Sequence, residues 1–250
     1  MRKFGLIGYP LGHSFSKTYF AGKFQNENIE DCAYDNYPLT DLNQLQKLII
    51  EEPDLCGLNV TIPYKSEIFR YLDVTENEAK EIGAVNVLKI KRLDGKVKLY
   101  GFNSDVTGIR DTLLPYINSD LKHAVVLGTG GSSKAVCYVL KKLGLEVTQI
   151  SRIRKPGISD YSDLNSQLFD KTGLIINTTP VGMFPDIESK PDINYSLLNQ
   201  KHILFDLVYN PEKTSFLKAG EEQGCKVLSG LKMLHSQAER AWKIWNDVNL

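Results

Sequence analysis

The chain has 250 residues, enough for one large domain or for two domains of about 100 to 150 residues that each bury a core. Thirty basic and thirty acidic side chains give a formal net charge of zero, which argues against a protein that binds by neutralising a phosphate backbone, so we expect no nucleic-acid partner. The four cysteines are scattered and lie near no histidine cluster, so we predict reduced thiols and no metal site.

The first part of the chain predicts strands and helices in alternation. Residues 3–8 are typical of a buried strand that stops at a glycine and proline turn, and a helix follows to about Asn28. A second strand at 32–37 precedes a helix with leucines at 42, 45 and 48. The apolar stretch before Pro10 is too short for a signal peptide, and no later run has membrane-spanning length. We therefore expect a cytoplasmic protein with no membrane partner.

Two serines follow the first strand, at the end where open α/β sheets place functional loops. Ser16 is a plausible N-cap of the next helix, in which case its hydroxyl satisfies backbone donors. Ser14 and Ser16 together could instead bind a polar ligand through paired hydroxyls. The spacing alone leaves both interpretations open.

The third predicted strand, from Leu58 to Thr61, stops before Pro63, which lacks a backbone donor and forces a turn. The turn presents Lys65 beyond the strand end. Considered alone, Lys65 is one of thirty basic residues on a solvated surface. The polar side chains of Asn59 and Thr61, at strand spacing on one face, favour a binding site instead.

Helical segments at 66–72 and 76–82 precede a β-hairpin that pairs residues 85–90 with 97–102. Asn86 is polar among apolar neighbours, so it either has a structural partner or binds a substrate hydroxyl. Asp105 follows the hairpin as the N-cap or first-turn acid of the next helix. A carboxylate at this junction is also placed to orient a lysine ammonium and to accept a substrate hydroxyl, and neither role excludes the other.

A new unit begins after residue 120, with a strand at 123–127, a glycine-rich turn, a helix and a strand at 146–150. This β-α-β pattern binds dinucleotides, because glycines let the backbone approach a pyrophosphate whose charge meets the helix N-terminus. Ser133 stands where a third glycine is usual and predicts looser packing of the helix on the strand. The cations Arg152, Arg154 and Lys155 suit the extra 2′-phosphate of NADP(H), and a solvated basic loop is the alternative.

Buried strands at 174–177 and 203–208 each end in a polar loop, at 178–183 and 209–211. If the sheet is parallel, both loops emerge at the same edge as the glycine turn, where a nicotinamide would lie. The last helix, from about Leu231 to Asn249, has apolar residues for burial. Gln237 interrupts them and is either exposed or a ligand contact.

Seven motifs, in order along nearly the whole chain, resemble the family of shikimate and quinate dehydrogenases; they are residues 8–16, 59–65, 83–86, 103–108, 128–132, 177–183 and the helix of Gln237. The resemblance implies an α/β fold of two domains with the active site in the cleft between them. A substrate-binding catalytic domain with a mixed sheet would span 1–104, completed by the C-terminal helix 233–250, and a Rossmann-like NADP-binding domain would span 105–232. The implied reaction is the reversible, NADPH-dependent reduction of 3-dehydroshikimate to shikimate in chorismate biosynthesis, by a monomer or a homodimer.

The same resemblance assigns roles by position. Lys65 and Asp105 would form the catalytic pair. The substrate-binding residues would be Ser14, Ser16, Thr61, Asn86, Asp105, Tyr209 and Gln237. The cofactor-binding residues would be Gly128, Thr129, Gly130, Gly131, Ser132, Ser151, Arg152, Arg154, Leu207 and Gly230.

The chain departs from the family's usual residues at three places: Lys17 replaces a proline, Val87 a threonine, and Ser151-Arg152-Ile153 an Asn-Arg-Thr signature. The last departure bears on the choice between NADP and NAD. A quinate/shikimate dehydrogenase of dual specificity would share every motif, whereas an oxidoreductase of another pathway would not reduce 3-dehydroshikimate. A non-catalytic NADP-binding sensor is expected to have lost Lys65 or Asp105, and both are present.

Overall fold

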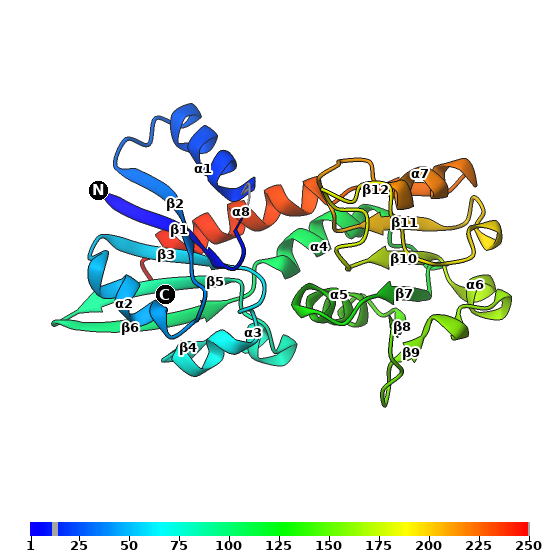
Figure 1. Ribbon diagram of the computed structural model, residues 1–250, viewed down its shortest axis with the longest axis horizontal. Coiled ribbons are helices and arrows are strands. Elements are labelled where there is room, and N and C mark those ends of the chain that lie inside the picture. Colours follow the sequence, from blue (N-terminus) through cyan, green and yellow to red (C-terminus); the bar gives the residue numbers. More distant parts are fainter. Residues whose placement is uncertain (12–14, 250) are drawn as a thin grey trace. The chain divides into compact units, whose positions relative to one another are not determined.

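A computed structural model describes residues 1–11 and 15–249. The chain divides into two compact units (Figure 1). The first unit consists of residues 1–104 together with the C-terminal residues from Gln237 onward, and the second unit runs from Asp105 to Ser236. None of the helices in the described part of the chain combines the length and the apolar character that crossing a membrane requires.

The strands of the first unit are β1 (Arg2–Gly8), β2 (Cys32–Pro38), β3 (Leu55–Val60), β4 (Val74–Thr75), β5 (Val87–Leu93) and β6 (Lys96–Phe102). Within the described residues they form one six-stranded sheet in the order β2-β1-β3-β5-β6-β4. β1 runs parallel to β2 and β3, and β5 runs antiparallel to β3 and β6. The sheet is therefore mixed, as predicted.

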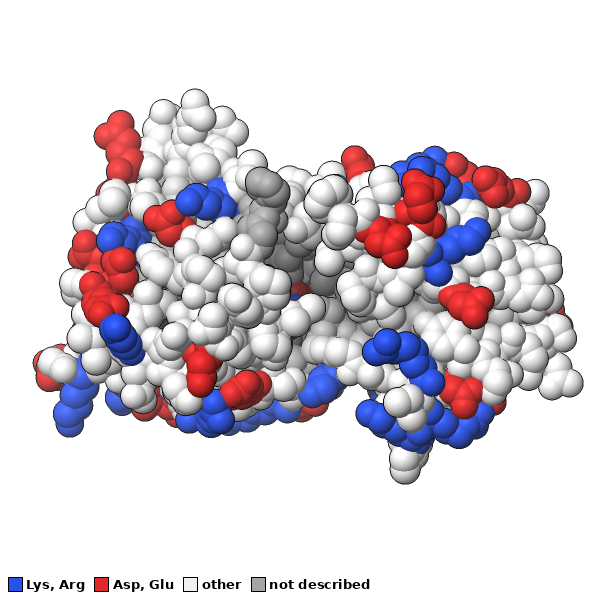
Figure 2. All heavy atoms as spheres, in the orientation of Figure 1, with Lys and Arg blue, Asp and Glu red and all other residues white. Residues whose placement is uncertain are grey.

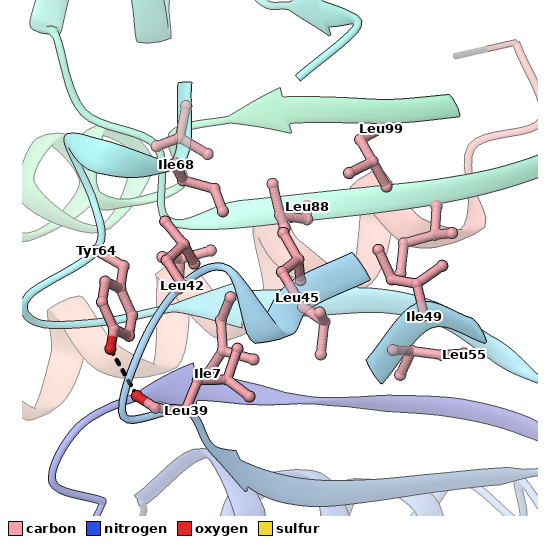
Figure 3. Packing of buried hydrophobic residues seen from close by; sticks show 14 of the residues in the cluster. Ile7, Leu39, Leu42, Leu45, Ile49, Leu55, Tyr64, Ile68, Leu88 and Leu99 are labelled. Carbon is pink, nitrogen blue, oxygen red and sulfur yellow. Dashed lines mark hydrogen bonds between the residues drawn. The ribbon is translucent and has the colours of Figure 1, made fainter. Parts of the chain in front are cut away.

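The helices of the first unit are α1 (Phe15–Asn26), α2 (Gln44–Glu51), η1 (Glu67–Tyr71), α3 (Asn77–Ile82) and α8 (Leu231–Asn246), whose first residues belong to the second unit. Side chains alternate along a strand, so each face of the sheet has its own core. Ile7 and Leu88 pack in one cluster with Leu45 of α2 (Figure 3). Phe4 and Val87 pack in another, with aromatic residues of α1 and α8.

The strands of the second unit are β7 (His123–Leu127), β8 (Glu146–Ser151), β9 (Ser159–Asp160), β10 (Leu174–Asn177), β11 (Ile203–Asp206) and β12 (Lys226–Leu228). The helices are α4 (Asp105–Leu113), η2 (Leu114–Tyr116), α5 (Gly131–Lys142), η3 (Tyr161–Asp163), α6 (Ser166–Lys171), η4 (Tyr195–Leu197) and α7 (Ser215–Glu222).

These strands pair in parallel, in the order β12-β11-β10-β7-β8-β9. Every residue of β7 and of β10 is buried, as in a parallel sheet that is covered on both faces. The carboxyl ends of β7, β10 and β11 therefore lie at one edge, which confirms the predicted parallel arrangement. That edge carries the glycine turn and both polar loops.

Several elements end at other residues than predicted. β3 stops one residue early, at Val60, and α8 stops at Asn246. The strand predicted to reach Val208 ends at Asp206, because the Asp206 carboxylate binds the backbone N–H of Val208 (3.0 Å). The short elements β4, β9 and η3 were not predicted, since two or three residues are too few for a recognisable period.

Candidate active site

The loop after β3 is fixed by hydrogen bonds at both ends. Thr61 N donates to a carbonyl of β1 (2.9 Å), and Lys65 O accepts from Val85 N (2.7 Å). Between them, the buried Tyr64 donates its hydroxyl to Leu39 O (2.6 Å; Figure 3). Thr61 and Lys65, both half-buried, are thereby held just beyond the end of β3, the position that the sequence predicts for Lys65.

Asn86 is buried and has a structural partner, one of the two alternatives considered for it. Its Oδ1 accepts from Ser104 N (2.7 Å), and its Nδ2 donates to Ser104 Oγ (3.1 Å). Its backbone carbonyl accepts from Val60 N at the end of β3 (2.8 Å). Asn86 thus joins the end of β3 to the residue before Asp105. Its role toward a substrate stays a prediction.

Asp105 is the first residue of α4 and is 1% exposed. This confirms its expected place in the first turn of a helix, where a carboxylate meets the positive end of the helix dipole. A buried carboxylate at the start of a helix suits both a structural and a catalytic role. Its role in catalysis stays a prediction.

Ser16 is not the helix N-cap that the sequence suggested, because α1 already begins at Phe15 and Ser16 lies in its first turn. The Tyr34 hydroxyl hydrogen-bonds Ser16 and donates to Asn59 Oδ1 (2.8 Å). Burial raises the pKa of the Tyr34 phenol, so it remains a neutral donor. Ser16 and Asn59 are therefore brought together through Tyr34. Ser14 lies outside the described residues.

Gln237 is half-buried on α8, two residues before a cluster of charges that joins α8 to α1. Glu239 accepts hydrogen bonds from the Tyr19 hydroxyl and from Lys23 Nζ (2.9 Å), both on α1. Partial burial acts to raise the pKa of Glu239, but these two donors outweigh it and hold that pKa below its usual value. The cluster connects the helix that carries Ser16 to the helix that carries Gln237.

The glycine turn after β7 is built around Gly128, whose φ of 110° is a conformation that favours glycine. A Cβ at this position would lie 2.6 Å from Thr178 Oγ1. Ser133 is buried and donates to Gly128 O (2.7 Å), so the residue in the third glycine position closes the turn. Gly130 directly precedes α5 and has no side chain that could cover the N–H groups of the first helical turn. Such a turn can accept an anion.

The two arginines of the basic loop between β8 and β9 differ in their contacts. Arg154 Nε donates to Asp160 Oδ2 (2.9 Å), and Arg154 Nη2 donates to Asp163 Oδ1 (2.7 Å). Arg154 therefore holds its own loop together. Arg152 is exposed directly after Ser151, the last residue of β8. Figure 2 shows Lys and Arg side chains gathered over this part of the second unit.

Leu207 and Gly230 lie in contact at the edge where β11 ends. A Cβ on residue 230 would lie 2.4 Å from Leu207 O, so this approach requires glycine. Leu207 N donates to Asn177 O (3.0 Å), which continues the pairing between β10 and β11 past the strand ends. Tyr209, two residues further, is half-buried. The backbone at this edge is thus closely packed.

Three buried polar residues at the same edge, Asn177, Asp206 and Thr214, received no role from the sequence. Asp206 accepts hydrogen bonds from Asn177 Nδ2 (3.0 Å) and from Thr214 Oγ1 (2.6 Å). Burial, which these hydrogen bonds only partly offset, raises the pKa of the Asp206 carboxyl to about 6. The sequence does contain a signal for Asp206, because this residue is a carboxylate at the end of an otherwise apolar strand.

The predicted site residues are distributed over both units. Those of the first unit that the structure describes are Ser16, Thr61, Lys65, Asn86 and Gln237. Those of the second unit are Asp105, Gly128, Thr129, Gly130, Gly131, Ser132, Ser151, Arg152, Arg154, Leu207, Tyr209 and Gly230. The first group supplies hydroxyl, amide and ammonium groups, which suit a polar, hydroxylated ligand, and the second supplies a glycine turn and a cationic loop, which suit a dinucleotide.

The chain is similar to known proteins over its full length. The family profile described as "Shikimate dehydrogenase substrate binding domain" matches residues 6–88. A shikimate dehydrogenase (NADP(+)) of Clostridium beijerinckii is 37% identical over 100% of this chain and 94% of the relative.

Solved structures of the same kind also match. Shikimate dehydrogenase 1 from Peptoclostridium difficile has a TM-score of 0.84 at 37% identity, covering 100% of this chain and 93% of that protein. The Thermus thermophilus shikimate 5-dehydrogenase in complex with NADP(H) and shikimate has a TM-score of 0.84 at 30% identity, covering 98% of this chain and 94% of that one. The two-unit architecture, the parallel sheet with its glycine turn and the full-length similarity agree: the chain belongs to the shikimate dehydrogenase family.

Proposed function

We propose that the protein catalyses the reversible reduction of 3-dehydroshikimate to shikimate by NADPH, a step in the biosynthesis of chorismate and the aromatic amino acids. The observation that carries this function is the similarity to enzymes named shikimate dehydrogenase (NADP(+)) over 98% to 100% of the chain. The protein is accordingly an NADP-dependent oxidoreductase that acts on a CH–OH group. Its cofactor is NADP(H).

We assign most of the substrate contacts to the first unit and the cofactor contacts to the second. The profile of the substrate-binding domain matches residues 6–88, all of which belong to the first unit. The parallel sheet of the second unit, with a glycine turn between β7 and α5, supports the cofactor assignment. The cytoplasm, and a monomer or a homodimer, remain our expectations for location and assembly.

The residues of the second unit fit NADP(H). A Cβ on residue 130 would meet nothing within 4 Å, so Gly130 leaves open space beside the uncovered first turn of α5, which suits a pyrophosphate. Arg152 is the cation that we assign to the 2′-phosphate, because Arg154 is already bound to two carboxylates of its own loop. Leu207 and Gly230 are assigned to the nicotinamide end. When bound, NADPH supplies the hydride.

Reduction of a carbonyl also needs a proton at the oxygen. We assign this proton to the Lys65 ammonium, which can both donate it and stabilise the negative charge that develops on the oxygen. Asp105 would orient that ammonium and accept a substrate hydroxyl. The remaining substrate hydroxyls and the carboxylate are assigned to Ser14, Ser16, Thr61, Asn86, Tyr209 and Gln237.

The test of this function is NADPH oxidation by the purified protein with 3-dehydroshikimate, repeated with NADH and with the quinate-series substrate. Turnover with 3-dehydroshikimate and NADPH is the expected result. A protein that binds NADPH but reduces neither substrate would refute the function, and preference for the quinate-series acid would change the substrate.

The role of Lys65 is tested by Lys65→Ala. We expect kcat to fall by about 10²-fold or more with little change in the KM for substrate, because the interaction is needed mainly in the transition state. Lys80→Ala is the matched control, since Lys80 is an exposed lysine on α3 of the same unit. A near-normal kcat in Lys65→Ala would remove Lys65 from catalysis.

A further inference from the structure

The Asp206 carboxylate holds both ends of the loop that follows β11. Its Oδ1 accepts a hydrogen bond from Val208 N (3.0 Å), and its Oδ2 accepts one from Thr214 Oγ1 (2.6 Å). Val208 lies at the start of the loop, and Thr214 is the residue before α7. Asp206 and Thr214 are both 0% exposed. One buried side chain thus closes the segment 207–214.

Asn177 extends these contacts to the loop after β10. Asn177 Nδ2 donates to Asp206 Oδ1 (3.0 Å) and to Val181 O (3.2 Å), and Asn177 Oδ1 accepts from Thr179 N (3.0 Å). The neighbouring Thr178 donates its hydroxyl to Leu127 O (2.6 Å), directly before the glycine turn. Hydrogen bonds therefore connect the loops that follow β7, β10 and β11.

Burial of a carboxylate at this place costs free energy, and this cost points to a function for the side chain. Desolvation raises the pKa of Asp206 to about 6 although Thr214, Val208 and Asn177 donate to it. An apolar residue would avoid this cost but would leave Val208 N, Asn177 Nδ2 and the Thr214 hydroxyl without their acceptor. The loop that Asp206 closes carries Leu207 and Tyr209, which we assigned to the nicotinamide end and to the substrate.

We propose that Asp206 is a positioning residue that holds the 207–214 loop, and through it the nicotinamide of NADP(H), in the orientation that hydride transfer requires. This inference rests on the proposed function for the identity of the cofactor and adds a residue that acts on the cofactor only through Leu207 and its neighbours.

The experiment compares Asp206→Ala with Asp206→Asn. Alanine removes the acceptors of Val208, Asn177 and Thr214 at once. Asparagine keeps Oδ1 for Val208 N and Asn177 Nδ2, and its amide can donate to Thr214 Oγ1, because a hydroxyl can accept as well as donate. The asparagine variant is therefore expected to retain most of the function that the alanine variant loses.

Two measurements separate positioning from a general loss of structure. In Asp206→Ala we expect kcat to fall by about tenfold or more and the primary isotope effect with 4-deuterated NADPH to rise, because a misplaced nicotinamide slows the hydride step. Independently of activity, we expect the affinity for NADPH to fall while the affinity for 2′,5′-ADP, which lacks the nicotinamide, stays unchanged. Asp206→Asn should resemble the wild type in all of these.

Thr172→Ala is the matched control for lost stability. Thr172 is buried at the opposite, amino-terminal edge of the same sheet, where its hydroxyl donates to Leu168 O (2.8 Å) and hydrogen-bonds His123 Nδ1 (2.9 Å). Its loss should lower Tm without changing kcat, the isotope effect or the ratio of the two affinities. If Asp206→Ala does not fold, Thr214→Val with Thr214→Ser as its control tests the same contact.

The outcomes are distinct. The proposal is overturned if Asp206→Ala behaves like Thr172→Ala, with a lower Tm and wild-type kinetics, or if it weakens NADPH and 2′,5′-ADP equally. A wild-type protein that does not reduce 3-dehydroshikimate would refute the proposed function instead. In that case the comparison of the two affinities decides the role of Asp206 without any turnover.

Discussion

Substitution of Gly57 by alanine should destabilise the first unit, because the backbone of β3 lies directly against a buried indole. A Cβ on residue 57 would lie 2.3 Å from both Cδ1 and Nε1 of Trp245 on α8. Trp245 is 6% exposed, its ring stacks on Phe4 with 4.8 Å between centroids, and it contacts Phe20. The indole is thus packed against several aromatic rings of the same core.

The expected magnitude follows from these contacts. Overpacking of a filled core costs about 1–3 kcal/mol. Displacement of the indole would also break the hydrogen bond from Trp245 Nε1 to Leu88 O (2.9 Å), and a buried N–H that loses its acceptor costs about 1–3 kcal/mol. Alanine offsets about 0.5–1 kcal/mol of this by reducing the freedom of the unfolded chain. We expect a net loss of about 2–4 kcal/mol in the free energy of unfolding.

Urea unfolding followed by tryptophan fluorescence measures this loss in the relevant unit, because the chain has two tryptophans and both, Trp242 and Trp245, lie on α8. Gly22→Ala is the control. Gly22 lies within α1 and a Cβ there would meet nothing within 4 Å, so alanine should stabilise by about 0.5–1 kcal/mol. A midpoint for Gly57→Ala at or above that of the wild type would refute the reasoning.

Further predictions concern charged side chains. Arg152→Ala should raise the KM for NADPH far more than the KM for NADH. Arg154→Ala should change both KM values alike, because Arg154 holds its own loop together. Steady-state kinetics with each cofactor measures these KM values, and equal effects of Arg152→Ala on both would contradict the prediction. Lys23→Met should cost about 1–2 kcal/mol in urea unfolding, since it leaves Glu239 without its ammonium donor, and an unchanged midpoint would show that this ion pair contributes nothing. The Asp206 carboxyl has a pKa of about 6 in the folded protein, against 3.8 when unperturbed. Its contribution to the free energy of unfolding is therefore complete below pH 3.8 and is lost as the pH rises through 6. The two pKa values correspond to a loss of about 3 kcal/mol. Thermal melts from pH 4 to pH 8 should therefore show the wild type losing stability relative to Asp206→Asn, and a constant difference in Tm would contradict this.

Much of the fold could be predicted from local patterns. The apolar runs that became β7, β10 and β11, each followed by turn residues, indicate buried parallel strands. The alternating residues on either side of the Asp94-Gly95 turn indicate the hairpin of β5 and β6. The glycine turn follows from its place between a strand and a helix. In each case the residues that determine the element are close together in the chain.

The candidate site could be predicted only in part, because its contacts join residues that are far apart in the chain. Glu239 meets Lys23 across 216 positions, and Asn177 meets Asp206 across 29, and no periodicity relates such pairs. The sequence placed Lys65 beyond a strand end but could not show that the side chain of Asn86 hydrogen-bonds Ser104. It also could not show that Arg154 pairs with Asp160 and Asp163.

The amino-acid sequence by itself determined which segments become strands and helices, that one sheet is parallel, and which turn can receive a dinucleotide, because periodicity and backbone conformation are local properties. Only the tertiary structure decided which polar groups pair. Arg154 is exposed but bound to Asp160 and Asp163, and Asp206 closes the loop after β11, because a hydrogen bond depends on distance in space and the packing of the sheet sets that distance.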